Sequence, residues 1–240
     1  NFRFGMATEW KKDGSPLTIT DTQINTFVIE AIKDVYPKHS VRGEEESSII
    51  LDSEYMWVCD PVDGTWPFTH GYPISTFSLA LVHDGQPILG VVYDPYLDRM
   101  FVAERGKGAF MNGKKISVNT SSGLGGFVVA VELLVKEWPY DYGSIMEELV
   151  ESGCRVLNFA SVIYTGMLVA AGQFSGTIWG GNTAHDAVTI KILVEEAGGV
   201  ATNIVGRDQR YDKPVNGIVA SNGLIHEKLL DIVKRNIIKN

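Results

Sequence analysis

Two carboxylates lie three positions apart at the end of an apolar run, Asp60 and Asp63 in the segment 57–65 (WVCDPVDGT). Mg²⁺ prefers hard oxygen ligands in near-octahedral geometry, and a strand that ends in a turn can aim both carboxylates and a carbonyl between them at neighbouring points. Gly64 lets the backbone approach a ligand closely, and a helix that opens at Thr65 would hold a phosphate with its free N–H groups. The segment therefore predicts a metal site beside a phosphate cradle.

Two other interpretations of this segment compete with the metal site. Asp-Gly pairs commonly form simple polar turns, and the segment alone does not exclude that interpretation. A covalent aspartyl-phosphate mechanism uses an apolar strand followed by DxDGT, in which the first Asp is the nucleophile. Here two residues separate Asp60 from Asp63, so the covalent motif fails.

The charge balance restricts the class of partner. The 240 residues include 21 basic and 29 acidic side chains, which gives a net charge of −8. Nucleic-acid and anionic-membrane binding proteins usually present a basic face, so neither partner is expected. The same balance, without a basic and aromatic groove, disfavours a metal-dependent nuclease. An acidic enzyme that handles phosphate must import positive charge, and a divalent cation is the simplest source.

The two cysteines indicate a reducing compartment. Cys59 and Cys154 cannot form a disulfide framework, and neither has a CxxC or CxxH partner. No apolar run approaches the roughly 20 residues that span a bilayer, and the first residues show no signal-peptide pattern. We therefore expect a cytoplasmic protein that is not embedded in a membrane.

The first half reads as one helix followed by strands. Apolar residues recur at helical spacing from Thr22 to Tyr36, and Asp21 or Thr22 can cap a helix that begins just after Asp21. Turn residues then separate four apolar runs, which predict strands at Tyr55–Cys59, Ser75–His83, Ile88–Tyr93 and Arg99–Glu104.

A Gly- and Ser-rich stretch at Ser121–Gly126 predicts a seam between two tightly packed halves, residues 1–122 and 123–240. Beyond it, helices and strands alternate, which favours a layered α/β half. The expected strands are Phe127–Val131, one near Val200 and Gly217–Ser221, and the expected helices are Ser144–Ser152, Val162–Ala171 and Ala187–Ala197.

Four separated blocks occur in an order that resembles one known family. They are Lys12–Asp21 (KDGSPLTITD), Tyr36–Ser47 (YPKHSVRGEEES), Trp57–Phe68 and His185–Gly199 (HDAVTIKILVEEAGG). With these blocks the chain resembles the inositol monophosphatase family, within the lithium-sensitive, metal-dependent sugar phosphatase superfamily. The resemblance covers most of the chain.

The resemblance implies a two-metal site. Glu44, Asp60 and the carbonyl of Val62 would bind one Mg²⁺, and Asp60, Asp63 and Asp186 a second, with Asp60 bridging the two ions. Two or three ions per site are implied, with Mn²⁺ as an alternative metal. Two metals would activate a water and neutralise the phosphoryl and leaving oxygens, so no phosphoenzyme is required.

The resemblance also implies catalytic and substrate-binding positions. Asp21 and Thr65 match the pair that positions and deprotonates the attacking water, with Glu44 close by through the metal. The N–H groups of Gly64 and Thr65 would hold the phosphate. The positions expected to contact the substrate are Asp63, Gly64, Thr65, Ser161, Trp179 and Asp186.

Three departures from the family pattern concern the substrate pocket. Trp179 stands where inositol-specific members have an acidic residue that contacts sugar hydroxyls. Ala160-Ser161-Val162 replaces a Gly-Ser/Thr-Ala segment that touches substrate. His185 stands where the family usually has Trp, and we expect it to be a hydrogen-bonded or surface histidine. The inositol ring is therefore in question, whereas the phosphate chemistry is not.

The resemblance implies a fold and a function. The fold is a five-layer α-β-α-β-α sandwich of the sugar phosphatase type, an α+β / α/β protein with a largely antiparallel sheet in its first half and an active site between the halves. The function is Mg²⁺-dependent, lithium-inhibitable hydrolysis of a small phosphate monoester, inositol monophosphate or a related polyol or sugar phosphate, by a homodimer.

Other functions stay open at this point. Histidinol phosphate, fructose 1,6-bisphosphate and 3′-phosphoadenosine phosphates are alternative substrates within the superfamily. A non-catalytic protein that binds a phosphorylated metabolite is an alternative of a different class. The presence of the whole set argues for an enzyme, because relaxed selection would erode at least one of Asp21, Glu44, Asp60, Asp63, Thr65 and Asp186.

Overall fold

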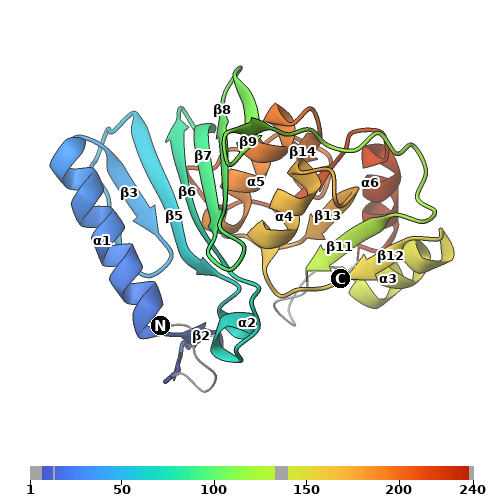
Figure 1. Cartoon of the computed structure of the whole chain (residues 1–240), viewed down its shortest axis with the longest axis horizontal. Coiled ribbons are helices and arrows are strands. Elements are labelled where there is room, and N and C mark those ends of the chain that lie inside the picture. The colour runs from blue at the N-terminus through green and yellow to red at the C-terminus, as the bar shows by residue number, and fades with distance from the viewer. Residues whose placement is uncertain (1–6, 13, 133–139, 238–240) are drawn as a thin grey trace.

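The computed structural model describes residues 7–12, 14–132 and 140–237, which form five layers (Figure 1). One helix covers the outer face of an eight-stranded sheet, two helices lie between that sheet and a five-stranded sheet, and two more helices cover the far side. This confirms the predicted α-β-α-β-α order. The helices are α1 (Ile19–Val35) outside, α4 (Val162–Ala170) and α5 (Ala184–Glu196) in the middle, and α3 (Tyr142–Glu151) and α6 (His226–Arg235) on the far side.

The two sheets differ in strand direction as expected. A single parallel pair interrupts an otherwise antiparallel first sheet, whereas parallel and antiparallel pairs mix in the second. The first sheet has the order β10 (Lys114–Lys115), β9 (Gly108–Met111), β8 (Arg99–Glu104), β7 (Gln86–Asp94), β6 (Thr76–His83), β5 (Tyr55–Asp63), β3 (Ser40–Gly43) and β4 (Ser47–Ser48). The second has the order β12 (Arg155–Leu157), β11 (Val128–Glu132), β13 (Gly176–Trp179), β15 (Ile218–Ser221) and β14 (Val200–Thr202).

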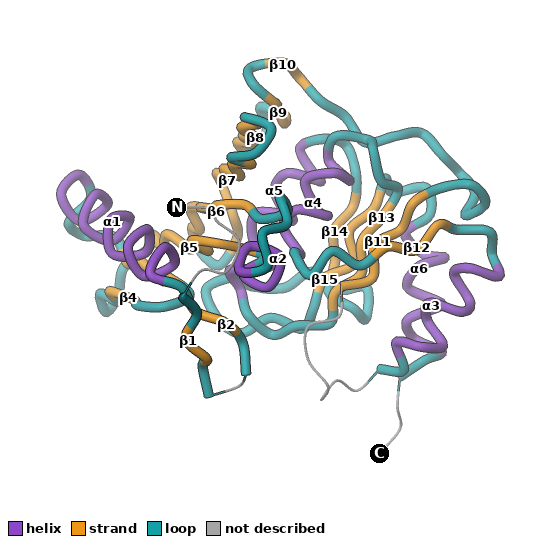
Figure 2. Tube along the Cα trace, turned by 60° about the horizontal axis from the view of Figure 1, so that its bottom comes forward, coloured by secondary structure: helices purple, strands orange, loops and turns teal. Residues whose placement is uncertain are grey.

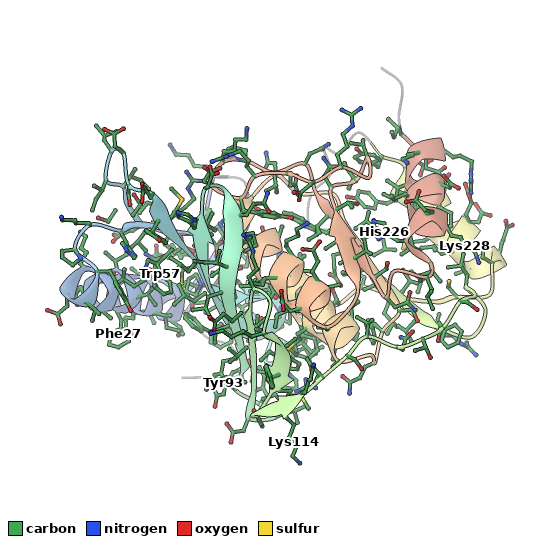
Figure 3. All side chains as sticks on the ribbon, turned by 90° about the horizontal axis from the view of Figure 1, so that it is seen from above. Phe27, Trp57, Tyr93, Lys114, His226 and Lys228 are labelled. Carbon is green, nitrogen blue, oxygen red and sulfur yellow. The ribbon has the colours of Figure 1, made fainter. Side chains whose placement is uncertain are left out.

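Helix α1 begins earlier than predicted. It starts at Ile19 rather than after Asp21, and its N-cap is Thr18 rather than Asp21 or Thr22. The cause is a capping box, in which the Thr18 side chain accepts a backbone N–H of the first turn and the Asp21 carboxylate accepts the Thr18 N–H at 2.9 Å. Phe27, which belongs to the predicted apolar stripe, is exposed instead (Figure 3).

The helices α4 and α5 form a core that both sheets share. Every residue of α4 is buried, because the helix lies between two sheets and has no solvent face. Gly166 lets the two helices approach closely, since a Cβ there would lie 2.5 Å from Cγ1 of Ile190. Helix α5 begins at Ala184, before the predicted Ala187, so Asp186 lies inside its first turn.

The predicted seam lies in the loop that leads from β10 of the first sheet to β11 of the second (Figure 2). One apolar cluster nevertheless includes strands of both sheets and both middle helices. The boundary between residues 122 and 123 therefore stays a prediction. Both cysteines are free and buried, and none of the helices that the structure describes is long and apolar enough to cross a bilayer.

Two small elements lie at one end of the layers (Figure 1). A hairpin pairs β1 (Glu9–Trp10) with β2 (Pro16–Leu17). The short helix α2 (Thr65–Thr69) follows β5 directly, so the predicted helix start at Thr65 is confirmed. Both elements border the pocket that contains the predicted metal ligands.

Candidate functional site

The end of β5 brings Asp60 and Asp63 to the same pocket. Residues three apart on a regular strand point to opposite faces of the sheet. The pairing of β5 with β6 shifts register between Asp60 and Asp63, which is the mark of a bulge. The irregularity allows both buried carboxylates to line one pocket and to approach within 4.8 Å of each other.

Glu44 lies beside Asp60 because strand β3 pairs in parallel with β5. Strand β3 runs parallel to β5 with Gly43 opposite Cys59, so the next residues along the two strands are Glu44 and Asp60. The Glu44 N–H donates to the Cys59 carbonyl at 3.1 Å and fixes the start of the loop. The carboxyl ends of two parallel strands thus deliver two acids to one point.

A pocket of about 280 Å³ lies between the two halves of the chain and contains all five predicted metal-binding positions. The first half contributes Gly14, Ser15, Pro16, Glu44, Asp60, Val62, Asp63, Gly64, Thr65 and Trp66. The second half contributes Ala160, Trp179, Gly181, Asn182, Thr183, His185 and Asp186.

The side chains fall into groups whose donor atoms all lie within 4.8 Å of one another. One group is Asp60, Asp63 and Asp186, and a second is Glu44, Asp60 and His185. Asp60 belongs to both groups, which is the position that a bridging ligand needs. Its bridging role, like the other ligand assignments, stays a prediction.

The electrostatics of these acids favour a bound cation. Burial raises the pKa of Asp60 well above its usual range, and the neighbouring carboxylates of Glu44 and Asp63 raise it further. Burial likewise raises the pKa of Asp63 to about 7 and raises the pKa of Asp186. Carboxylates gathered away from water resist ionisation unless positive charge is supplied. The donor set therefore fits a hard divalent cation.

Asp63 also holds the N-terminus of α4. Its carboxylate accepts the Ser161 hydroxyl at 2.5 Å and the N–H groups of Val162, Ile163 and Tyr164 at 3.0, 3.0 and 3.1 Å. Free N–H groups and the helix dipole favour a carboxylate at this place. Asp63 of the first half is thus tied to the second half beside the predicted metal site.

Asp21 and Thr65, the predicted water-activating pair, lie together. The Thr65 hydroxyl donates to the Val62 carbonyl at 3.0 Å and lies 3.4 Å from Oδ1 of Asp21. Gly64 is the N-cap of α2 and has φ of 84°, a left-handed conformation that favours glycine. A Cβ there would lie 2.8 Å from the Ile74 carbonyl oxygen, so no larger residue fits.

Comparison with known proteins now identifies the family. A family model described as the inositol monophosphatase family matches residues 3–237. The chain belongs to the inositol monophosphatase family. Members of this family are hydrolases of phosphate monoesters. Membership therefore confirms both the predicted resemblance and the predicted enzyme class.

Individual relatives agree with this inositol monophosphatase assignment. The fructose-1,6-bisphosphatase/inositol-1-monophosphatase of Thermotoga maritima is 30% identical over 227 residues, which cover 93% of this chain and 85% of that protein. A Thermotoga maritima IMPase structure superposes with a TM-score of 0.85 at 29% identity, covering 95% of this chain and 87% of that one. An IMPase/NADP phosphatase complexed with Mg²⁺ and phosphate gives a TM-score of 0.85 at 25% identity, covering 96% and 87%.

Trp179 and Ser161, the two positions predicted to affect substrate choice, lie in different surroundings. Trp179 lines the pocket although it is only 2% exposed, and Gly181 packs directly against it, since a Cβ there would lie 1.5 Å from the indole ring. Ser161 is fully buried and its hydroxyl binds Asp63. Whether either side chain contacts substrate stays a prediction.

The sequence did not indicate two side chains that contact the predicted ligands or line their pocket. The ammonium group of Lys11 lies 2.7 Å from the Glu44 carboxylate and 2.6 Å from that of Glu45. Although burial lowers the pKa of Lys11, these two carboxylates raise it overall. His185 lines the pocket, with 15% of its side chain exposed, rather than lying on the surface. Its position next to Asp186 was the signal that could have placed it here.

Glu132 is a third side chain that the sequence did not indicate. It is fully buried at the end of β11 and accepts the N–H groups of Phe159 and Ser161 at 3.0 and 3.3 Å. Burial raises the pKa of Glu132 to about 7, even though these hydrogen bonds lower it. Glu132 therefore fixes the loop that leads into α4.

The stability of the metal-free protein should depend on pH through Glu132. Its pKa is about 7 in the folded protein against an ordinary value of 4.5, so the folded state holds a proton that the unfolded state releases between these pH values. The contribution of Glu132 to the free energy of unfolding is therefore full below about pH 4.5. It is lost as pH rises to about 7, by about 3 kcal/mol in total. Urea unfolding in EDTA across this range measures the effect.

The matched variants for this measurement are Glu132→Gln and, at an exposed site of α3, Glu147→Gln. Buried acids such as Asp60 titrate in all three proteins, so the comparison isolates Glu132 together with its electrostatic coupling to Asp63. We expect the stability gap between wild type and Glu132→Gln to change across the range, and Glu147→Gln to follow wild type. Parallel curves for wild type and Glu132→Gln would contradict the prediction.

Proposed function

We propose that the chain is a Mg²⁺-dependent phosphatase of a small phosphate monoester, inositol monophosphate or a related polyol or sugar phosphate. The observation that carries this proposal is the single pocket in which Asp60 belongs to two groups of metal-binding side chains. Glu44, Asp60 and the Val62 carbonyl would hold one ion, and Asp60, Asp63 and Asp186 a second. The relative complexed with Mg²⁺ and phosphate supports this choice of metal.

The side chains around these acids suit hydrolysis by water. Bound Mg²⁺ supplies charge neutralisation on the phosphoryl and leaving oxygens and lowers the pKa of a coordinated water. Asp21 and Thr65, which lie 3.4 Å apart, would orient the water and take its proton. The N–H groups of Gly64 and Thr65 would hold the phosphate at the start of α2.

The substrate class within the family rests on Trp179. A carboxylate at this position accepts hydrogen bonds from sugar hydroxyls, whereas an indole offers only one N–H donor. The pocket therefore lacks the acceptor on which inositol-specific binding depends. Relatives whose names combine inositol monophosphatase with fructose-1,6-bisphosphatase or NADP phosphatase support a wider substrate range.

A panel of phosphate esters tests the proposal. Phosphate release is measured with inositol 1-phosphate, histidinol phosphate, fructose 1,6-bisphosphate and 3′-phosphoadenosine 5′-phosphate, in Mg²⁺ and in EDTA. We expect turnover of at least one ester in Mg²⁺, none in EDTA and inhibition by lithium, as superfamily membership implies. Absence of turnover throughout would favour the non-catalytic binding protein, and turnover that lithium leaves unchanged would contradict close membership.

Variants at Trp179 test the substrate assignment separately. Trp179→Glu should raise kcat/KM for inositol 1-phosphate relative to the other esters by about 10-fold, because it restores a hydroxyl acceptor. Trp179→Phe keeps an aromatic ring and is the matched control, and circular dichroism shows whether each variant folds. An unchanged ranking of esters in a folded Trp179→Glu enzyme would show that Trp179 does not determine which ester is preferred.

The cytoplasmic location and the homodimer belong to this proposal as well. The location rests on the two free cysteines, and the homodimer rests on the family resemblance. Light scattering on the purified chain measures the assembly directly.

A further inference from the structure

The first turn of α5 presents one metal-binding side chain to each of the two groups in the pocket. Asp186 joins Asp60 and Asp63, whereas the adjacent His185 joins Glu44 and Asp60. The donor atoms of the second group all lie within 4.8 Å of one another. The imidazole thus faces the pair of acids to which the first ion is assigned.

Outside the second group, His185 makes one long polar contact among the described residues. Its Nε2 atom lies 3.6 Å from Oδ2 of Asp186, which is too long for a hydrogen bond. Among the residues that the structure describes, no hydrogen bond to the imidazole is found, and the side chain of Thr183 binds Asp186 instead. The ring is mostly buried in the pocket, since 15% of the side chain is exposed, and Asp186 contacts it at ion-pair distance without a hydrogen bond.

We propose that His185 donates a nitrogen ligand to the cation held by Glu44 and Asp60, and that this ligand strengthens the binding of a first-row transition cation such as Mn²⁺ more than that of Mg²⁺. This inference rests on the proposed metal site of the phosphatase. A neutral imidazole binds transition metals well, whereas Mg²⁺ strongly prefers oxygen ligands. The Trp that usually stands here in the family offers no ligand atom, so the preference would belong to this chain.

Mn²⁺ itself is the probe for the test. The metal-free chain is loaded with Mn²⁺, and pulsed electron paramagnetic resonance detects ¹⁴N coupling from a coordinated imidazole without reference to turnover. We expect ¹⁴N coupling in wild type and its loss in both His185→Gln and His185→Trp. The matched control is His83→Gln, at the far end of β6 and away from the pocket lining, which should keep the signal.

Affinity gives a second readout. Calorimetric titration should show that His185→Gln weakens Mn²⁺ binding by about 10-fold or more and leaves Mg²⁺ binding within about 3-fold. Wild-type protein that binds Mn²⁺ and hydrolyses phosphate esters without ¹⁴N coupling would overturn the role of His185 and leave the phosphatase intact. Failure to bind Mn²⁺ or Mg²⁺ at all would instead overturn the proposed metal site itself.

Discussion

Asp60→Asn is expected to reduce phosphate release by about 10³-fold or more, because one substitution removes a ligand from both groups of metal-binding side chains. Equilibrium dialysis with Mn²⁺ or Mg²⁺ should show weaker binding and fewer ions per chain. In EDTA the same variant should be at least as stable as wild type. Burial and neighbouring carboxylates already oppose ionisation of Asp60, so an uncharged amide removes an unfavourable interaction.

The control for this prediction is Asp34→Asn, which changes an exposed acid of α1. We expect wild-type turnover and metal binding from it, which separates a loss at the site from a loss of overall negative charge. An Asp60→Asn protein that still binds two ions with wild-type affinity would show that Asp60 does not bridge them.

Asp63→Ala should lose both activity and stability. Besides removing a predicted ligand, it leaves the Ser161 hydroxyl and three N–H groups at the start of α4 without their acceptor. A buried donor left without an acceptor costs about 1 to 3 kcal/mol, and relief of the burial that raises the pKa of Asp63 offsets part of the summed loss, so we expect a net cost of about 3 to 5 kcal/mol. For a chain of this size that lowers the unfolding midpoint by about 10 °C, even with EDTA present. Calorimetry in EDTA measures the change.

Asp63→Asn is the informative companion, because its amide oxygen can still accept hydrogen bonds from α4. It should lose metal binding as fully as Asp63→Ala and lose less stability. If Asp63→Ala and Asp60→Asn unfold at the same temperature in EDTA, the contacts of Asp63 with α4 do not stabilise the folded chain.

Strands and the acids of segment 57–65 could be predicted because their signals are local, whereas the layer order and the full set of ligands came from the family resemblance. Apolar runs and turn residues indicated strands such as Arg99–Glu104, which the structure reproduces. The four motif blocks named the acids that the pocket brings together. Helix starts were less accurate, since the Thr18 capping box satisfies the first turn of α1 before the residues that looked like caps.

Contacts between distant segments could not be predicted. The partners of Asp63 at the start of α4 lie 98 to 101 positions away along the chain, so the spacing of residues within one motif cannot predict them. The bulge that brings Asp60 and Asp63 to one side depends on the pairing of β5 with β6. The place of His185 beside the ligands could not be predicted either, because its neighbours in space are acids from β5 and the loop after β3.

The shared middle layer also sets the order in which the chain can fold during synthesis. The inner face of the first sheet is complete once β10 has left the ribosome, but α4 and α5, which cover that face, are made only after residue 161. Until then the nascent sheet exposes an apolar face, as incompletely synthesised domains do. The first sheet can therefore complete its packing only after α4 and α5 have been synthesised, and the two halves reach their native state together.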